Sequence, residues 1–499
     1  MTEVRSENVA KRYRAERRFR FYGAAALALT ALFLAVLLAD VVVKSIPAFT
    51  EKRVELEVRI DPDKVDAAQP LAGDYEAMVR EAFRDLFPEV EGRANRKALS
   101  SLLSSGAADD LRSMVGANPG MIGTSIKIPV LLSDDADLYT KGLQTDTKAA
   151  PGAFALHLAP LAGEEGYQLT GQASAQGQAS LAVGDIIRFD GGALRITKLE
   201  NGNASAEVLM APAGALETLA SGQWDILRFS VTEANRRITD KQALWLEKLK
   251  AEGRIETSFN WRFFTAGDSR EPELAGIRGA LVGSLLTVTV ALALALPLGI
   301  AAAIYLEQFA PKNRFTDIIE VNINNLAAVP SIIFGLLGLA IFLNVFGMPR
   351  SAPVVGGLVL ALLVLPTIII ASRAALKAVP PSIIEAALGV GASHQQAVFH
   401  HVLPLALPGI MTGTILGLAR AFGETAPLLM IGMVAFIADV PHGFTDAATV
   451  LPVQVFLWSD LPEIAFQSKT AAAIIVLLAV LFALNAAAIY LRKHFERRW

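Results

Sequence analysis

Six stretches of the chain are apolar over the length of about 20 residues that a helix needs to cross a bilayer. They cover residues 21–43, 277–305, 326–346, 353–372, 405–437 and 471–491. The stretches are separated by segments that carry charges, prolines and glycines. The pattern therefore predicts six transmembrane helices.

Residues 44–276, between the first and second stretches, have a different pattern. "DYEAMVREAFRDLFPEV" repeats apolar residues at helical spacing, and residues 234–252 read as a second amphipathic helix. "VGDIIRFDGGALRITKLENGNASAEVLM" alternates apolar and polar residues around turns at 191–192 and 201–202, which is typical of a small antiparallel sheet. We therefore expect an α-helical membrane protein with an α+β domain inserted after its first span.

Basic residues give the orientation, since Lys and Arg concentrate on the cytoplasmic side. Those that flank the first and last spans are Arg12, Arg14, Arg17, Arg18, Arg20, Arg492, Lys493, Arg497 and Arg498. Both termini and the loop 373–404 are thus expected in the cytoplasm, and the inserted domain outside. The first stretch lacks a small-residue cleavage site, so it reads as an uncleaved anchor. The expected order is a basic N-terminus (1–20), a first transmembrane helix (21–43), an outer domain (44–276), a five-helix transmembrane domain (277–491) and a basic tail (492–499).

Composition agrees with a membrane protein and excludes several kinds of chemistry. Of 499 residues, 53% are hydrophobic and 19% are charged. The net charge of −3 gives no sign of nucleic-acid binding, and the absence of cysteine excludes disulfides and thiolate metal sites. A nucleotide-binding G-x-x-x-x-G-K-[ST] loop is also missing, so the chain is not expected to hydrolyse ATP. No cofactor or metal is expected.

The segment "PPSIIEAALGVGASHQQAVFHHVLP", residues 380–404, is too polar to be a span. Ser382 and Glu385 have capping-box spacing, which predicts a helix that begins here, and Gly391 can adopt the left-handed conformation that ends a helix. Ser393 and Gln396 repeat the capping pattern.

A second short helix is therefore expected after the first, and Pro404 is expected to end it. A rigid helix pair with small residues at its turn can enter a groove on a partner and transmit force to the flanking spans. An ordinary capped loop on the membrane surface is the alternative.

This segment resembles the EAA loop of ABC importer permeases, although His401 replaces the usual isoleucine. The matching residues are Glu385, Ala386, Ala387, Gly391, Leu403 and Pro404. The resemblance implies that the loop fits a groove on a separate ATP-hydrolysing subunit.

Longer matches resemble the phosphate-specific ABC permeases of the PstA kind. They are "FFTAGDSREPELAGIRGALVGSL", "NNLAAVPSIIFGLLGLAIF", "LPTIIIASRAALKAVP" and "LARAFGETAPLLMIG". The outer domain extends beyond the shorter members, and Arg373 stands where they often have an acidic residue. The resemblance implies a bacterial inner-membrane permease subunit for inorganic phosphate. Its implied partners are an ATP-binding dimer, a second homologous permease and an extracytoplasmic phosphate-binding protein.

Arg420 and Glu424 are charges within the fifth apolar stretch. Ionised groups at membrane depth cost about 2.5–3.5 kcal/mol or more on insertion scales, so they usually face protein or water and serve a function. Their i,i+4 spacing places them on one helix face, where Arg420 could offer a planar fork to phosphate oxygens. The alternative is an ion pair that only locks the bundle. Ser331, beside Pro330, is a further pathway candidate, although satisfying a freed backbone carbonyl is its simpler role.

Three other functions are alternative explanations of the sequence pattern. A permease for molybdate or sulfate would use the same charges. A membrane sensor would usually carry a large cytoplasmic output region, and the sequence contains none. A membrane-embedded enzyme would need a larger cluster of catalytic groups than Arg420 and Glu424.

The orientation gives a first testable prediction. Protease added to spheroplasts should cleave within residues 50–265 and spare the loop 373–404, because arginine-rich ends flank an even number of spans. Fragments mapped by mass spectrometry would report the sites. Cleavage in the loop with the 50–265 region spared would reverse the topology.

Overall fold

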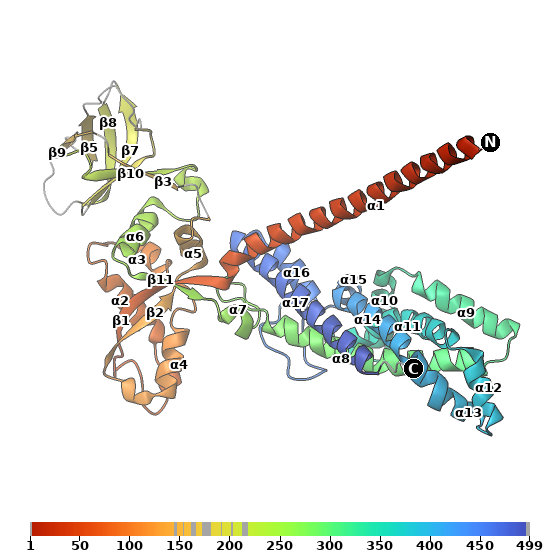
Figure 1. The fold of residues 1–499 in the computed structure, drawn as a ribbon. Coiled ribbons are helices and arrows are strands. Elements are labelled where there is room, and N and C mark those ends of the chain that lie inside the picture. The colour runs from red at the N-terminus through yellow and green to blue at the C-terminus, as the bar shows by residue number, and fades with distance from the viewer. Residues whose placement is uncertain are drawn as a thin grey trace. The chain divides into compact units, whose positions relative to one another are not determined.

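The computed structural model describes residues 2–143, 147–152, 154–160, 166–171, 181–190, 192–200, 203–211 and 218–495. Contacts divide the chain into a unit of Met1–Phe49 with Trp261–Trp499 and a unit of Thr50–Asn260. In the described residues the first unit is helical and the second carries the strands (Figure 1). The expected fold class, a helical membrane protein with an inserted α+β domain, is confirmed. Gly191, Asn201, Gly202, Arg497 and Arg498 lie outside the described residues.

The membrane unit contains long helices joined by short ones. The long helices are α1 (Thr2–Ser45), α8 (Arg278–Ile304), α11 (Pro353–Lys377), α14 (Leu403–Gly423) and α17 (Ile464–Phe495). The shorter helices are α7 (Arg262–Thr265), α9 (Arg314–Ala327), α10 (Ser331–Gly338), α12 (Pro381–Gly389), α13 (His394–Ala397), α15 (Ala426–Met430) and α16 (Leu451–Ser459). Three π-helical turns, at Tyr305–Phe309, Leu339–Val345 and Val398–Val402, extend α8, α10 and α13. In the described residues five helices are long and apolar enough to span, and a bent pair makes a sixth if it is counted as one span.

The third predicted span, 326–346, is broken in the structure. The chain is helical over Arg314–Ala327, breaks, and continues as Ser331–Val345 at an angle of 100°. Pro330 explains the break, because proline has no N–H to donate and disfavours helical backbone at the preceding Val329. Each half is shorter than the roughly 20 residues of a complete span.

The predicted fifth span, 405–437, has different bounds. Its helix begins in the preceding loop, runs continuously over His394–Gly423 and ends before Glu424. The short α15 follows, and most of 434–450 is irregular. Apolar composition continues beyond Gly423, but these residues pack against other helices of the bundle instead of extending the span.

A stripe of three glycines brings α14 against α11. A Cβ on Gly413 would lie 2.1 Å from Ala371 Cβ, and one on Gly409 would lie 2.7 Å from Ala375 Cβ. A Cβ on Gly417 would lie 2.7 Å from a Val364 methyl. Small residues four apart allow two helices in a bilayer to approach closely, so that dispersion contacts hold them together.

In its described residues the second unit, Thr50–Asn260, contains two antiparallel sheets, and its helices lie between strands along the chain. A three-stranded sheet has the order β11-β1-β2 and an eight-stranded sheet the order β3-β10-β6-β7-β8-β5-β4-β9. The strands are β1 (Thr50–Arg59), β2 (Ser125–Leu131), β3 (Thr147–Pro151), β4 (Leu156–Pro160), β5 (Gly166–Gly171), β6 (Ile186–Phe189), β7 (Gly192–Glu200), β8 (Asn203–Met210), β9 (Thr218–Leu219), β10 (Trp224–Phe229) and β11 (Ile255–Phe259). The helices are α2 (Tyr75–Asp85), α3 (Arg93–Ser100), α4 (Asp109–Ala117), α5 (Asp134–Thr140) and α6 (Asp240–Ala251).

The predicted sheet is confirmed as β6, β7 and β8, which pair in sequence order, but it is part of a larger sheet. The helix expected over 234–252 begins later, at Asp240, where Thr239 and Gln242 form a capping box. Arg188 of β6 joins this helix to the sheet, because it pairs with Asp225 at 2.6 Å and with Glu247 of α6 at 3.2 Å.

Residues 261–277 pack with the membrane unit. Phe263 and Ile277 are fully buried in one core with Trp458 and Phe466. The Trp458 indole N–H donates to Asp268 at 3.0 Å. Burial raises the pKa of the Asp268 carboxyl, and the Trp458 hydrogen bond opposes that rise. This conformation of 261–277 therefore depends on the transmembrane helices.

The glycine stripe gives a stability prediction. Gly413→Leu should lower the thermal unfolding midpoint in detergent, because forcing a side chain into a packed contact costs about 1–3 kcal/mol. Gly23→Leu on α1 is the matched control, since a Cβ there meets no atom within 4 Å. Equal midpoints for the two variants would show that the α11–α14 contact does not depend on the glycine.

Candidate functional site

The first helix of the loop 373–404 is α12, and it presents two of the motif residues to solvent. Glu385 and Ala386 are exposed, whereas Ala387 is 6% exposed and faces the protein. The predicted capping by Ser382 is wrong. The N-cap is Pro380, without a side-chain cap, and Pro381 occupies the first turn. Proline's fixed φ suits that position, so the helix begins two residues earlier than a Ser382 cap requires.

Gly391 ends the helix as predicted, with a φ of +92°. The Gly391 N–H donates to the Leu388 carbonyl at 2.9 Å, and the Ala392 N–H donates to the Ala387 carbonyl at 3.1 Å. These bonds satisfy carbonyls at the helix end. A Cβ on Gly391 would meet nothing within 4 Å, so backbone conformation and not space requires glycine.

The second capping box is confirmed. The Gln396 N–H donates to Ser393 Oγ at 3.2 Å, and the Ser393 N–H donates to Gln396 Oε1 at 2.9 Å. The prediction that Pro404 ends this helix is wrong, because α13 continues through the π turn Val398–Val402 into α14. A π turn accommodates one extra residue, and Pro404 then lies in the first turn of α14, where its missing N–H is tolerated.

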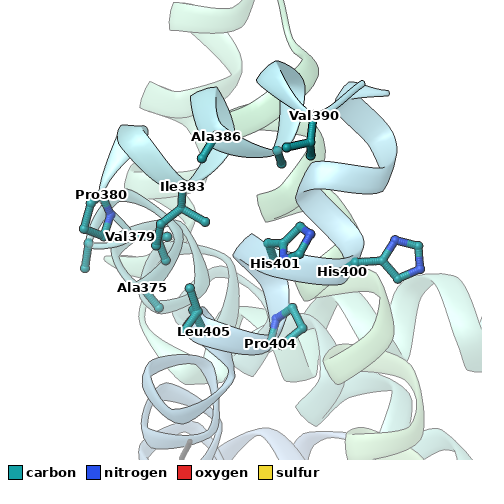
Figure 2. Close-up of a pocket in the computed structure, with 12 residues that line it drawn as sticks. Ala375, Val379, Pro380, Ile383, Ala386, Val390, His400, His401, Pro404 and Leu405 are labelled. Carbon is teal, nitrogen blue, oxygen red and sulfur yellow. The ribbon is translucent and has the colours of Figure 1, made fainter. Parts of the chain in front are cut away.

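The loop encloses an apolar groove of about 960 Å³ between α12 and the beginning of α14 (Figure 2). Its lining residues are Ala375, Ala378, Val379, Pro380, Ile383, Ala386, Ala387, Val390, His400, His401, Pro404 and Leu405. The rings of His400 and His401 point in different directions in Figure 2, which does not suit joint metal binding. Val390, at the tip, is 86% exposed.

The two predicted membrane charges are in contact at the other end of α14. Arg420 Nε lies 3.4 Å from Glu424 Oε1, and their side chains are 46% and 19% exposed. Glu424 is the residue that caps the helix C-terminus. Gly417, one turn before Arg420, faces Val364 near the middle of α11.

Ser331 lies on a different element, as the first residue of α10. Four residues later, a Cβ on Gly335 would lie 2.6 Å from Pro427 Cα. The second half of the broken span therefore packs on α15, immediately after Glu424. Ser331 lies about one turn before this contact on α10.

Two features were missed in the sequence. The Gly409-x-x-x-Gly413-x-x-x-Gly417 spacing is a known signal for close helix packing. Arg373, noted only as a departure, pairs with Glu320 at 2.9 Å and with Glu307 at 3.5 Å. The sequence shows that Arg373, Glu307 and Glu320 lie near the ends of apolar stretches. It does not show which of these side chains form ion pairs.

Comparison with known proteins decides the family. Residues 295–499 match the family described as binding-protein-dependent transport system inner membrane component, and residues 6–150 match a domain of unknown function, DUF3333. Over 257 residues the chain is 32% identical to the phosphate transport system permease protein PstA 1 of Mycobacterium tuberculosis, covering 51% of this chain and 83% of that protein. This chain belongs to the PstA family of phosphate transport system permeases. It is a longer form, with an additional N-terminal domain.

Other relatives of this PstA-family permease are less extensive matches. The PstA protein of Mycobacterium leprae is 30% identical over 231 residues, which cover 46% of this chain and 75% of the relative. The PstC permease of the same organism is 36% identical over 194 residues, covering 34% and 60%. A chain of the MetNI methionine ABC transporter has 19% identity and a TM-score of 0.33, covering 44% of this chain and 96% of that chain. The assignment therefore rests on sequence.

Proposed function

We propose that this PstA-family chain is the permease subunit of an ATP-driven importer of inorganic phosphate. It forms half of the transmembrane pathway with a second homologous permease and couples through residues 380–404 to a separate ATP-binding dimer. The observation that supports this proposal most directly is the continuous helix His394–Gly423. This helix is about 45 Å long at the usual helical rise, with the capped loop at one end and the Arg420–Glu424 pair near the other.

The loop has the properties of a docking element. Its two helices are held by the Gly391 turn and the Ser393–Gln396 capping box, so little conformational entropy remains to be lost on binding. Glu385 and Val390 are exposed and available to a partner. Because α13 is continuous with α14, a displacement of the loop moves the whole helix. ATP hydrolysis belongs to the partner subunit, and this chain is a transport component with no catalytic role.

The membrane pair suits an oxyanion. Arg420 is a planar donor that can bind two oxygens at once, and nearly half of its side chain is left uncovered by this chain. Glu424 holds the guanidinium and limits how tightly an anion binds. Molybdate or sulfate would fit the same donors, but the PstA-family relatives favour phosphate.

The remaining parts of the proposal concern location. The chain is a multi-pass inner-membrane protein, and we place both termini in the cytoplasm and the outer domain in the periplasm. An extracytoplasmic phosphate-binding protein would deliver the anion on that side. Lipid covers the outer surface of the spans.

The docking role predicts that Gly391→Pro abolishes ATPase co-purification and phosphate uptake, because proline cannot adopt a φ of +92°. Glu385→Arg, a charge reversal on the exposed face of α12, should have the same effect. Gly389→Ala is the matched control, since it lies on α12 with open space around its Cβ. Co-purification and uptake at parental values in Gly391→Pro would exclude the loop as the coupling element.

The pathway role predicts that Arg420→Ala abolishes uptake of radiolabelled phosphate while the complex still assembles. Arg420→Lys should restore little, because a point charge lacks the planar fork. Competition by sulfate and molybdate in the parent protein would identify the preferred oxyanion. Arg420→Ala with parental uptake would remove Arg420 from the pathway.

The double variant Arg420→Met/Glu424→Leu distinguishes the pathway role from the alternative, in which the pair only stabilises the bundle. The double replacement leaves no charge without its partner at membrane depth, so this variant should assemble. If Arg420 contacts the anion, the assembled complex transports no phosphate. Uptake at the parental rate, at matched protein level, would instead assign the pair to bundle stability.

A further inference from the structure

One guanidinium connects three elements at the cytoplasmic end of the bundle. Arg373 lies near the end of α11, and its Nη1 is 2.9 Å from Glu320 Oε1 on α9. Its Nε is 3.5 Å from Glu307 Oε2, in the π turn that ends α8. Arg373 and Glu307 are only 13% and 16% exposed, so water screens this pair less than a surface ion pair.

The same π turn also contacts the coupling loop. The His394 ring nitrogen Nε2 lies 3.0 Å from the Gln308 carbonyl oxygen. The Phe309 ring meets the His394 ring edge-on, with centroids 5.2 Å apart. Successive residues of one turn therefore bind the inner end of α11, through Glu307, and the beginning of α13, through Gln308 and Phe309.

The helix α9 is held on the bundle by the Glu320 pairing and by partial packing, such as that of Ile323 against a core of α8, α11 and α14 residues. None of the residues of α9, Arg314–Ala327, is buried. Beyond the 100° bend, α10 packs on α15 next to Glu424. The position of α9 therefore affects α10 and α15, the helices next to the membrane charges Arg420 and Glu424.

We propose that Arg373 is a positioning residue for coupling. It fixes the cytoplasmic ends of α8, α9 and α11 in one arrangement, so that a displacement of the loop at His394 also moves the broken span α9–α10. This inference rests on the proposed coupling function of the loop. Arg373 suits the task because a planar guanidinium can bind two carboxylates from different directions, whereas an ammonium acts as a point charge.

Lys377 provides a matched control within the same helix. It lies one turn beyond Arg373 and pairs with Glu307 at 3.6 Å, but its side chain is 57% exposed. Substituting Lys377 removes the same charge from the same helix end. The Glu320 contact that reaches α9 is unaffected by that change.

The first experiment measures phosphate taken up per ATP hydrolysed by the full complex in proteoliposomes. Arg373→Gln and Glu320→Gln should retain ATP hydrolysis within about twofold and lose at least about tenfold in uptake, a loss corresponding to about 1.4 kcal/mol of coupling. Arg373→Lys should restore little of the uptake. Lys377→Gln should remain within about twofold of the parent in both activities. Equal effects of Arg373→Gln and Lys377→Gln, or parallel losses of hydrolysis and uptake, would overturn the proposal.

The second experiment does not depend on transport. Because the chain contains no cysteine, Asp317→Cys on α9 and Gln395→Cys on α13 give a unique pair of spin-label sites. Both positions are exposed. In the full chain in nanodiscs, the distance distribution should be narrow in the parent and in Lys377→Gln, and broad in Arg373→Gln. An unchanged distribution in Arg373→Gln would refute the positioning role.

The two readouts separate this inference from the proposed function. If the spin-label distances respond to Arg373→Gln but the parent complex takes up no phosphate, the positioning role stands and the phosphate assignment fails. If the parent transports phosphate but neither readout distinguishes Arg373→Gln from Lys377→Gln, the phosphate assignment stands and Arg373 has no positioning role.

Discussion

The close approach of α14 to α11 is the contact that positions both candidate sites of the membrane unit. In a bilayer, lipid is as apolar as a side chain, so helices associate by close packing and not by burial from water. Gly409 and Gly413 place the α14 backbone against Ala375 and Ala371, and no larger residue fits at this distance. This contact sets the position of α14, and with it the loop at one end and the Arg420–Glu424 pair near the other.

Arg373, Arg420 and Glu424 lie near the ends of membrane helices. The Arg420–Glu424 pair lies at the end of α14, and Arg373 pairs at the end of α11 with carboxylates from two other elements. A helix end exposes unsatisfied backbone groups, so the chain there is already close to water or to other polar groups. A charge placed there costs less free energy than one in the middle of an apolar helix, and its ion pairing can change when the helix end moves.

Proline has different effects at different places in this chain. Pro330 separates two helices that meet at 100°, whereas the helix that contains Pro404 continues without interruption. Pro297, Pro366 and Pro408 lie inside helices as well. The π turn before Pro404 accommodates the missing N–H, whereas the chain bends at Pro330 and the second half packs on α15. Each outcome depends on what the flanking segments pack against.

Sequence alone located the apolar segments of the membrane unit, although not the break in the third or the bounds of the fifth. It also showed that an α+β domain is inserted after the first segment and that the 380–404 loop turns at Gly391. These features depend on local properties: apolar length, alternation along a strand, and a backbone conformation that only glycine adopts readily. The tertiary structure alone decided where the third span breaks, that His394–Gly423 is one helix, and that Arg373 meets Glu307 and Glu320. These depend on contacts between residues far apart in the chain, and the spacing of residues along a sequence carries no record of such contacts.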